Sequence, residues 1–191
     1  MPYNKLKEHI GLGNSVDQKF ASKIMTTRHY VLNNPHNNAK LQKAIQSLKQ
    51  DPHKIARTDR EKRATGAALQ IAIGLAHSLD ISTRFVCTIG GPCTVGVGKV
   101  VNIPLKSHIR SYVDIFENNE NTEHLASATA FYEGLSKVLV DNRHTIDIWS
   151  YGLDQFGLME MKNMVSNSGG MLAMHEEFNH FIFKTSFEKF Y

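Results

Sequence analysis

Long apolar runs are missing from this sequence, and cysteine and tryptophan are scarce. The 191 residues include two cysteines and one tryptophan. No apolar stretch approaches the length of a membrane-spanning helix, and the opening segment, MPYNKLKEHI, lacks the apolar core of a signal peptide. Two cysteines cannot form a disulfide framework. We therefore expect a cytosolic protein in which Cys87 and Cys93 are reduced thiols.

A large excess of charge of one sign is also missing. The formal net charge is +4, which is too small to argue for nucleic-acid binding but is compatible with an anionic partner or membrane surface. Hydrophobic residues make up 41% of the chain, enough for a core, and charged residues make up 21%. At this length we expect one domain, or one domain with a small appendage.

The stretch from Thr83 to Val101, TRFVCTIGGPCTVGVGKVV, organises the rest of the chain. Residues 84–89 form a short apolar run between Asp80 and the turn-forming Gly90-Gly91-Pro92. Such a run predicts a strand that is buried on both faces. One helical pattern precedes it and another follows about twenty residues later, which indicates a parallel sheet.

Hydrophobic periodicity predicts the remaining elements in alternation. Helices are expected over residues 40–50, 62–78, 124–140, 154–165 and 177–191, and further strands over 145–151 and 171–174. Thr58 and Glu61 match a capping box for the second helix, while Thr122 and Asp154 are candidate N-caps for the next two. Residues 99–114 are expected to be extended or irregular, and not helical. The order predicts half of a doubly wound α/β sheet, a piece of a larger domain without the strands that would cover its first edge.

The glycine-rich loop Gly90–Lys99 is the first candidate for chemistry. A P-loop needs a glycine where the chain has Cys93, and Ser or Thr where it has Val100. A dinucleotide-binding loop needs a third glycine where the chain has Val101. The favoured interpretation is a structural turn that uses the access of glycine to positive φ.

Metal and nucleophile patterns fail in the same way. The ten histidines form no His-x-x-x-His pair with a third ligand, and no Cys-x-x-Cys is present. The segment Asp80-Ile-Ser82 supplies only half of an Asp-x-Ser-x-Ser metal motif. No catalytic signature accompanies Cys93, so we expect that thiol to be inert. We predict neither a bound metal nor a catalytic residue.

Several blocks, in matching order and spacing, nevertheless resemble one protein family. They are Arg63-Ala-Thr-Gly66, Ile89-Gly-Gly-Pro-Cys-Thr94, Ile109-Arg-Ser111, Asp114-Ile115, Ile146-Asp-Ile148, Leu153-Asp-Gln-x-Gly157-Leu, Glu160-Met-Lys162, Gly169-Gly170 and Phe183-Lys184. From about Lys40 to the last residue, the chain resembles the trunk domain of the GTPase-activating subunit of the COPII inner coat, the Sec twenty-three family. Residues 1–38 match this family poorly.

The resemblance implies a fold and a set of partners. The family's trunk is a von Willebrand factor A-like α/β domain, with a mostly parallel sheet flanked by helices and a degenerate metal site. Residues 39–191 would form its C-terminal part. In the family, trunk surfaces contact the sister cargo-adaptor subunit, the Sar-type small GTPase and the outer-cage subunit at the endoplasmic reticulum membrane. The family's arginine finger and zinc finger lie in other domains, so Arg63 and Arg110 receive no catalytic role and no cofactor is expected in this chain.

We therefore expect a non-catalytic scaffold in transport from the endoplasmic reticulum to the Golgi. The chain would be cytoplasmic and peripheral on the endoplasmic reticulum membrane and COPII vesicles, in contact with anionic lipid but not with nucleic acid. The candidate partner-binding residues are Arg110, Tyr112, Phe178 and Asn179, with burial as the competing expectation for Phe178. The whole protein would activate a GTPase through a domain not present here. The alternative is a small α/β enzyme that binds a phosphate-bearing ligand at the Gly90–Lys99 loop.

Overall fold

The structure, a computed structural model, describes residues 38–49, 55–78, 82–117, 120–152, 155–177 and 179–191. These residues divide into two compact units. One contains helix α3 (Asn38–Gln46) and residues 74–78, and the other contains residues 56–73 and those described from 82 onward. None of the described helices combines the length and the apolar character that crossing a membrane requires. The sheet and every feature discussed below belong to the second unit.

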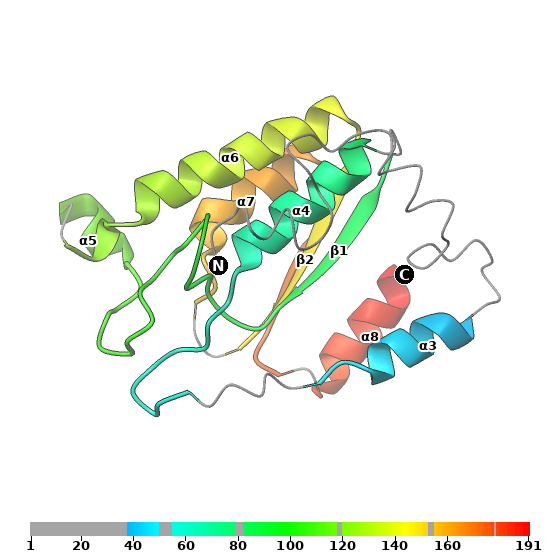
Figure 1. Cartoon of the computed structure of the whole chain (residues 1–191), viewed down its shortest axis with the longest axis horizontal. Coiled ribbons are helices and arrows are strands. Elements are labelled where there is room, and N and C mark those ends of the chain that lie inside the picture. Colours follow the sequence, from blue (N-terminus) through cyan, green and yellow to red (C-terminus); the bar gives the residue numbers. More distant parts are fainter. Residues whose placement is uncertain (1–37, 50–54, 79–81, 118–119, 153–154, 178) are drawn as a thin grey trace. The chain divides into compact units, whose positions relative to one another are not determined.

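A three-stranded parallel sheet is the framework of this unit (Figure 1). Its strands are β1 (Arg84–Ile89), β2 (Thr145–Tyr151) and β3 (Leu172–His175), in the order β1-β2-β3. Arg84 lies opposite Thr145, and Ile148 lies opposite Leu172. The three predicted strands and their parallel pairing are confirmed, with β3 beginning and ending one residue later than predicted.

Helices cover both faces of the sheet. The first part of α4 (Thr65–Ser78), α6 (Leu125–Asp141) and α7 (Leu158–Asn167) pack on one face, where they share a continuous apolar core with Ile146 and Ile148. On the other face, α8 (Phe181–Phe190) places Phe183 against Trp149 and Tyr151. Two short elements, α5 (Tyr112–Glu117) and η1 (Glu120–Thr122), precede α6. This arrangement confirms the predicted α/β class.

The predicted burial of the first strand is wrong. Along β1, Arg84, Val86 and Thr88 are exposed and alternate with two partly buried residues and the buried Ile89. The reason is position, because β1 is an edge of the sheet among the described residues and has β2 as its one neighbour. The strand buried on both faces is β2, in which every residue after Thr145 is buried.

Several predicted helix starts are also wrong. The second helix begins at Thr65, not at 62, and Thr58 and Glu61 lie in the preceding loop, where the Glu61 carbonyl accepts a hydrogen bond from the Thr94 hydroxyl at 2.7 Å. For α6 the N-cap is His124, not Thr122, and its side chain makes no capping bond. The predicted cap Asp154 lies outside the described residues. The segment expected to be extended or irregular up to residue 114 already enters α5 at Tyr112.

A buried carboxylate in β2 ties the second unit together. Asp147 is fully buried, and its Oδ2 accepts hydrogen bonds from Arg84 Nε and from the Tyr191 hydroxyl, each at 2.6 Å. Its Oδ1 accepts from Arg84 Nη2 at 3.2 Å and from the Met171 N–H at 2.8 Å. One side chain thus joins β1, β2, the residue before β3 and the residue after α8.

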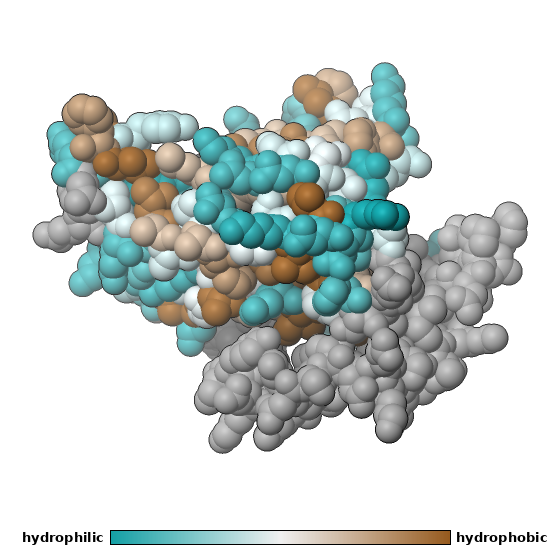
Figure 2. Space-filling model, turned by 90° about the horizontal axis from the view of Figure 1, so that it is seen from above, coloured by the Kyte–Doolittle hydropathy of each residue, from teal (hydrophilic) through white to brown (hydrophobic). Residues whose placement is uncertain are grey.

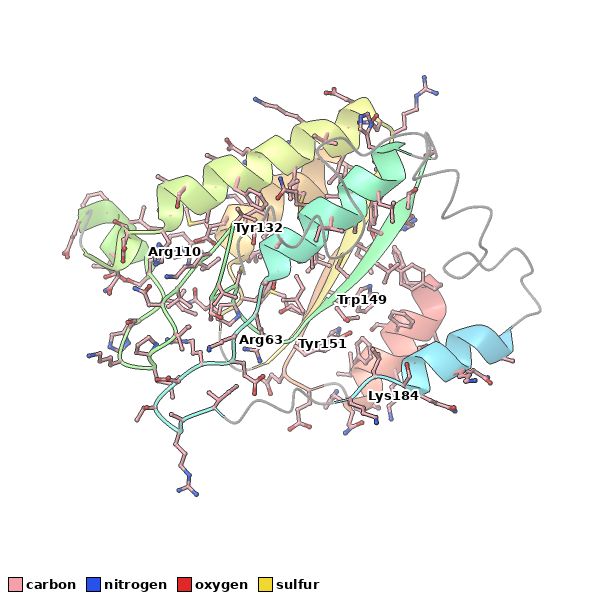
Figure 3. All side chains as sticks on the ribbon, viewed as in Figure 1. Arg63, Arg110, Tyr132, Trp149, Tyr151 and Lys184 are labelled. Atoms are coloured by element: carbon pink, nitrogen blue, oxygen red, sulfur yellow. The ribbon has the colours of Figure 1, made fainter. Side chains whose placement is uncertain are left out.

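Aromatic rings pack together on the α8 side of the sheet, where Figure 3 labels Trp149 and Tyr151. The Trp149 ring stacks on His175 and meets Phe183 and Phe187 edge-on, with centroid separations of 6.2, 5.5 and 5.1 Å. The Arg84 guanidinium lies 5.1 Å from the centroid of Phe190, a cation–π distance. Burial by itself would raise the pKa of Asp147, but the hydrogen bonds from Arg84, Tyr191 and Met171 outweigh it and lower that pKa.

We predict that Asp147→Asn destabilises the chain and removes part of its acid sensitivity. The variant loses charge-assisted hydrogen bonds and should be about 1.5–3 kcal/mol less stable at pH 7. Because the folded pKa of Asp147 lies below its unfolded value of about 3.9, this contribution is present above pH 4 and lost as the pH falls through the folded pKa. Urea unfolding followed by the fluorescence of Trp149, the one tryptophan, should therefore show the two proteins converging in stability between pH 5 and pH 2. If the unfolding free energies of the two proteins changed with pH in parallel, Asp147 would not have a lowered pKa in the folded chain.

Candidate partner-binding site

The loop Gly90–Lys99 is a packing element. Thr94 is buried; its N–H donates to the Arg63 carbonyl at 2.9 Å, and its hydroxyl accepts from the Arg63 N–H at 2.9 Å. The Val95 N–H donates to the same carbonyl at 3.2 Å. Gly96 and Gly98 have φ values of +79° and +70°, so the predicted turn with positive φ is confirmed. The amide groups of Thr94 and Val95 are thus engaged within the protein and are not turned toward a phosphate.

Close approach explains why the loop needs glycine. A Cβ at Gly66 in α4 would lie 2.1 Å from the Val97 carbonyl oxygen, and one at Gly98 would lie 2.7 Å from the Tyr132 hydroxyl. That hydroxyl donates to the Gly98 carbonyl at 2.9 Å (Figure 3). Cys93 in the same loop is 0% exposed, and its thiol lies 3.7 Å from the Val97 carbonyl oxygen. The blocks around Gly66 and Gly98 therefore belong to one packing arrangement in which α4, the loop and α6 meet.

The structure brings other blocks together around a groove of about 350 Å³. The groove lies between the segment that begins α5, the loop before α7, the first turns of α7 and the end of β3. Its lining residues are Arg110, Ser111, Tyr112, Ile115, Gln155, Phe156, Leu158, Met159, Lys162 and Met174. Two of the predicted partner-binding residues, Arg110 and Tyr112, are thus placed at one site.

Arg110 is held in the wall of this groove by a buried ion pair. Its Nε donates to Glu160 Oε1 at 3.0 Å and its Nη2 donates to Glu160 Oε2. Its Nη1 donates to Gln155 Oε1 at 3.1 Å. Arg110 and Glu160 are 5% and 1% exposed. The guanidinium braces the first turn of α7 against the segment before α5, while a contact of Arg110 with a partner stays a prediction.

The other predicted residues lie in different surroundings. Tyr112 is 82% exposed at the start of α5. Asn179 is exposed in the turn before α8 and does not line the groove. Phe178 lies outside the described residues.

Beside the predicted Tyr112, the sequence reasoning missed two exposed apolar residues of α5, Val113 and Phe116. In α5, Tyr112, Val113 and Phe116 are 82%, 62% and 92% exposed, and none of the residues in this helix is buried. Figure 2 shows apolar surface gathered at its left-hand end, the end at which Figure 1 places α5. The signal was present as bulky apolar residues on both sides of Asp114, the last residue of the segment that was expected not to be helical. A short helix with three exposed bulky side chains and a groove beside it is suited to a protein partner.

Within the described ranges, no three His, Cys, Asp or Glu side chains come together in a way that could hold a metal ion.

Comparison with known proteins shows a similarity at the level of a family and of individual relatives. The family model described as Sec23/Sec24 trunk domain matches residues 13–191. The chain is also similar to an Arabidopsis thaliana protein described as "Protein transport protein SEC23 F", with 34% identity over 149 residues. That alignment covers 77% of this chain and 19% of the plant protein, so the chain spans about a fifth of the length of this relative.

We predict that the Arg110–Glu160 pair is strongly coupled. Arg110→Met leaves a buried carboxylate and Glu160→Met leaves a buried guanidinium, so each single variant should lose about 3–5 kcal/mol of unfolding free energy. The double variant removes both charges together and should be less destabilised than either single one. Urea unfolding of the four proteins measures this coupling. Additive losses in the double variant would show that the two charges do not depend on each other.

Proposed function

Because this chain belongs to the Sec23/Sec24 trunk domain family, as a trunk of the Sec23 kind, we propose that it is the non-catalytic docking part of a COPII coat subunit. The subunit would act in transport from the endoplasmic reticulum to the Golgi, on the cytoplasmic side of the membrane and of COPII vesicles. Its proposed partners are the sister cargo adaptor, the Sar-type small GTPase and the outer-cage subunit. The observation that carries the docking role is the exposed apolar surface of α5.

The character of this surface favours the sister adaptor as its occupant. Interfaces that persist through the life of a complex are more apolar than those that form and separate repeatedly. Tyr112 and Phe116 are the kind of large aromatic residues that dominate binding energy when a partner buries them. We assign the α5 surface to the adaptor, and leave the GTPase to a more polar surface of the trunk.

The internal contacts of the chain support a non-catalytic role. An arginine that completes the active site of a GTPase must reach into that site from the surface. The guanidinium of Arg110 is buried and paired with Glu160. The proposal needs no cofactor in this chain, and the catalytic arginine would come from another domain of the whole protein. The trunk would contribute by holding the partners in register, which reduces the entropy lost on association.

We expect the double variant Tyr112→Ser/Phe116→Ser to bind the sister adaptor roughly 10–100-fold more weakly, because two buried aromatic contacts are lost. Isothermal titration calorimetry with the purified adaptor measures the change. Val140→Ser is the matched control, since it removes an exposed apolar side chain from α6 and should leave the affinity unchanged. Equal binding by the double variant and the unmodified chain would remove α5 from the interface.

We expect this chain alone not to stimulate GTP hydrolysis by the Sar-type GTPase, and the full-length protein to do so. Single-turnover hydrolysis followed by phosphate release makes the comparison. Stimulation by this chain alone would contradict the non-catalytic role, and Arg63→Ala would then be the first variant to measure, because that side chain is 31% exposed. Absence of stimulation by the full-length protein would count against the coat assignment.

A further inference from the structure

The outer edge of β3 carries unpaired backbone groups. In a parallel ladder, alternate residues of a strand direct both their N–H and C=O toward the same neighbour. The Ile148 N–H donates to the Met171 carbonyl at 2.8 Å, and the Gly152 N–H donates to the His175 carbonyl at 3.2 Å. Met171, Ala173 and His175 therefore face β2. Leu172 and Met174 direct their backbone groups away from the sheet, where no described residue bonds to them.

The groove lies beside this edge, on the face toward which Met174 points. Met174 is 57% exposed and lines the groove together with Leu158 and Met159 of α7. In a sheet, residues opposite each other on adjacent strands place their side chains on the same face, about 5 Å apart. A residue of an added strand that lay opposite Met174 would therefore direct its side chain into the groove.

One positive charge in the groove has no ion-pair partner among the residues that the structure describes. Two basic residues line it, and the charge of Arg110 is taken up by Glu160. Lys162 is exposed, and among the described residues no carboxylate lies within ion-pair distance of it. The groove therefore combines apolar walls with one uncompensated cation, and an acidic ligand group would complement it.

We propose that β3 binds an extended segment of a partner protein, which adds a fourth strand to the sheet. The segment carries a bulky apolar side chain that fills the groove opposite Met174, and an acidic residue two positions away on the same face that pairs with Lys162. Backbone hydrogen bonds to Leu172 and Met174 provide affinity, and the two alternate side chains provide selectivity. This inference concerns the groove and the edge and does not require the coat assignment or the α5 interface.

The test uses a display library of random heptapeptides selected on the chain of residues 1–191. We expect enrichment of peptides with a bulky apolar residue and an Asp or Glu two positions apart. Fluorescence polarisation of a synthetic enriched peptide then gives its affinity. Replacing its acidic residue by the corresponding amide, or Lys162 by Gln, should weaken binding several-fold. A peptide with Lys at the acidic position should bind Lys162→Glu more tightly than it binds the unmodified chain.

Two further measurements separate strand addition from simple occupation of the groove. In a bound peptide strand, the N–H groups of every second residue face β3. N-methylation of one of these residues should weaken binding about tenfold or more, whereas N-methylation of a residue between them should weaken it about twofold or less. In the protein, Met174→Pro removes an outward N–H without removing a bond to β2, so it should abolish peptide binding. The control Met174→Thr also removes the methionine side chain but keeps that N–H, and it should weaken binding less.

Two outcomes would overturn the inference. One is the absence of any enriched peptide. The other is a series of N-methylated peptides in which the loss of affinity does not alternate from one residue to the next. If Met174→Pro does not fold, the N-methyl series on the unmodified chain still decides the question. Failure of the α5 variants to affect adaptor binding would leave this result unchanged, so the two proposals fail separately.

Discussion

The fold of the second unit depends on a buried negative charge in its central strand. A carboxylate without partners in a protein interior costs several kcal/mol, so Asp147 must be surrounded by donors. Those donors come from Arg84 in β1, the Met171 amide before β3 and the Tyr191 hydroxyl after α8. Since each belongs to a different part of the chain, satisfying one side chain sets the positions of both neighbouring strands and of the helix on the far face.

Other polar groups of this unit also form their hydrogen bonds and ion pairs within the protein. In the glycine-rich loop, the Thr94 and Val95 amides donate to the carbonyl just before α4. The guanidinium of Arg110 forms an ion pair with Glu160. The Gly90–Lys99 loop, which resembles a phosphate-binding loop, and Arg110, which was predicted to bind a partner, therefore both stabilise the packing of this unit. The exposed surface of α5 is mainly apolar, and the groove beside it has apolar walls, with Lys162 and the outer edge of β3 as polar elements.

Much of the architecture could be predicted because it follows from local pattern. The apolar runs at 84–89 and 145–151 are bounded by breakers and became β1 and β2 at those residues. Helix starts were less predictable. Thr58 and Glu61 have the residue types of a capping box, but no helix begins there. Instead, the Glu61 carbonyl accepts a hydrogen bond from Thr94, and Arg60 donates to the Pro104 carbonyl at 2.9 Å. A capping motif reports only compatibility with a helix, and a competing long-range contact decides whether one forms.

The sequence by itself determined the class of the fold, the order of its elements and the family, because periodicity, breakers and spaced motifs are properties of the chain. Only the tertiary structure decided which strand is central, since burial depends on the number of neighbouring strands. Among the described residues, β2 has two such neighbours and β1 has one. Only the tertiary structure placed Arg110 inside and Tyr112 outside, although they are two residues apart. Their difference arises from Glu160, fifty residues further along the chain, which lies within reach of one side chain and not of the other.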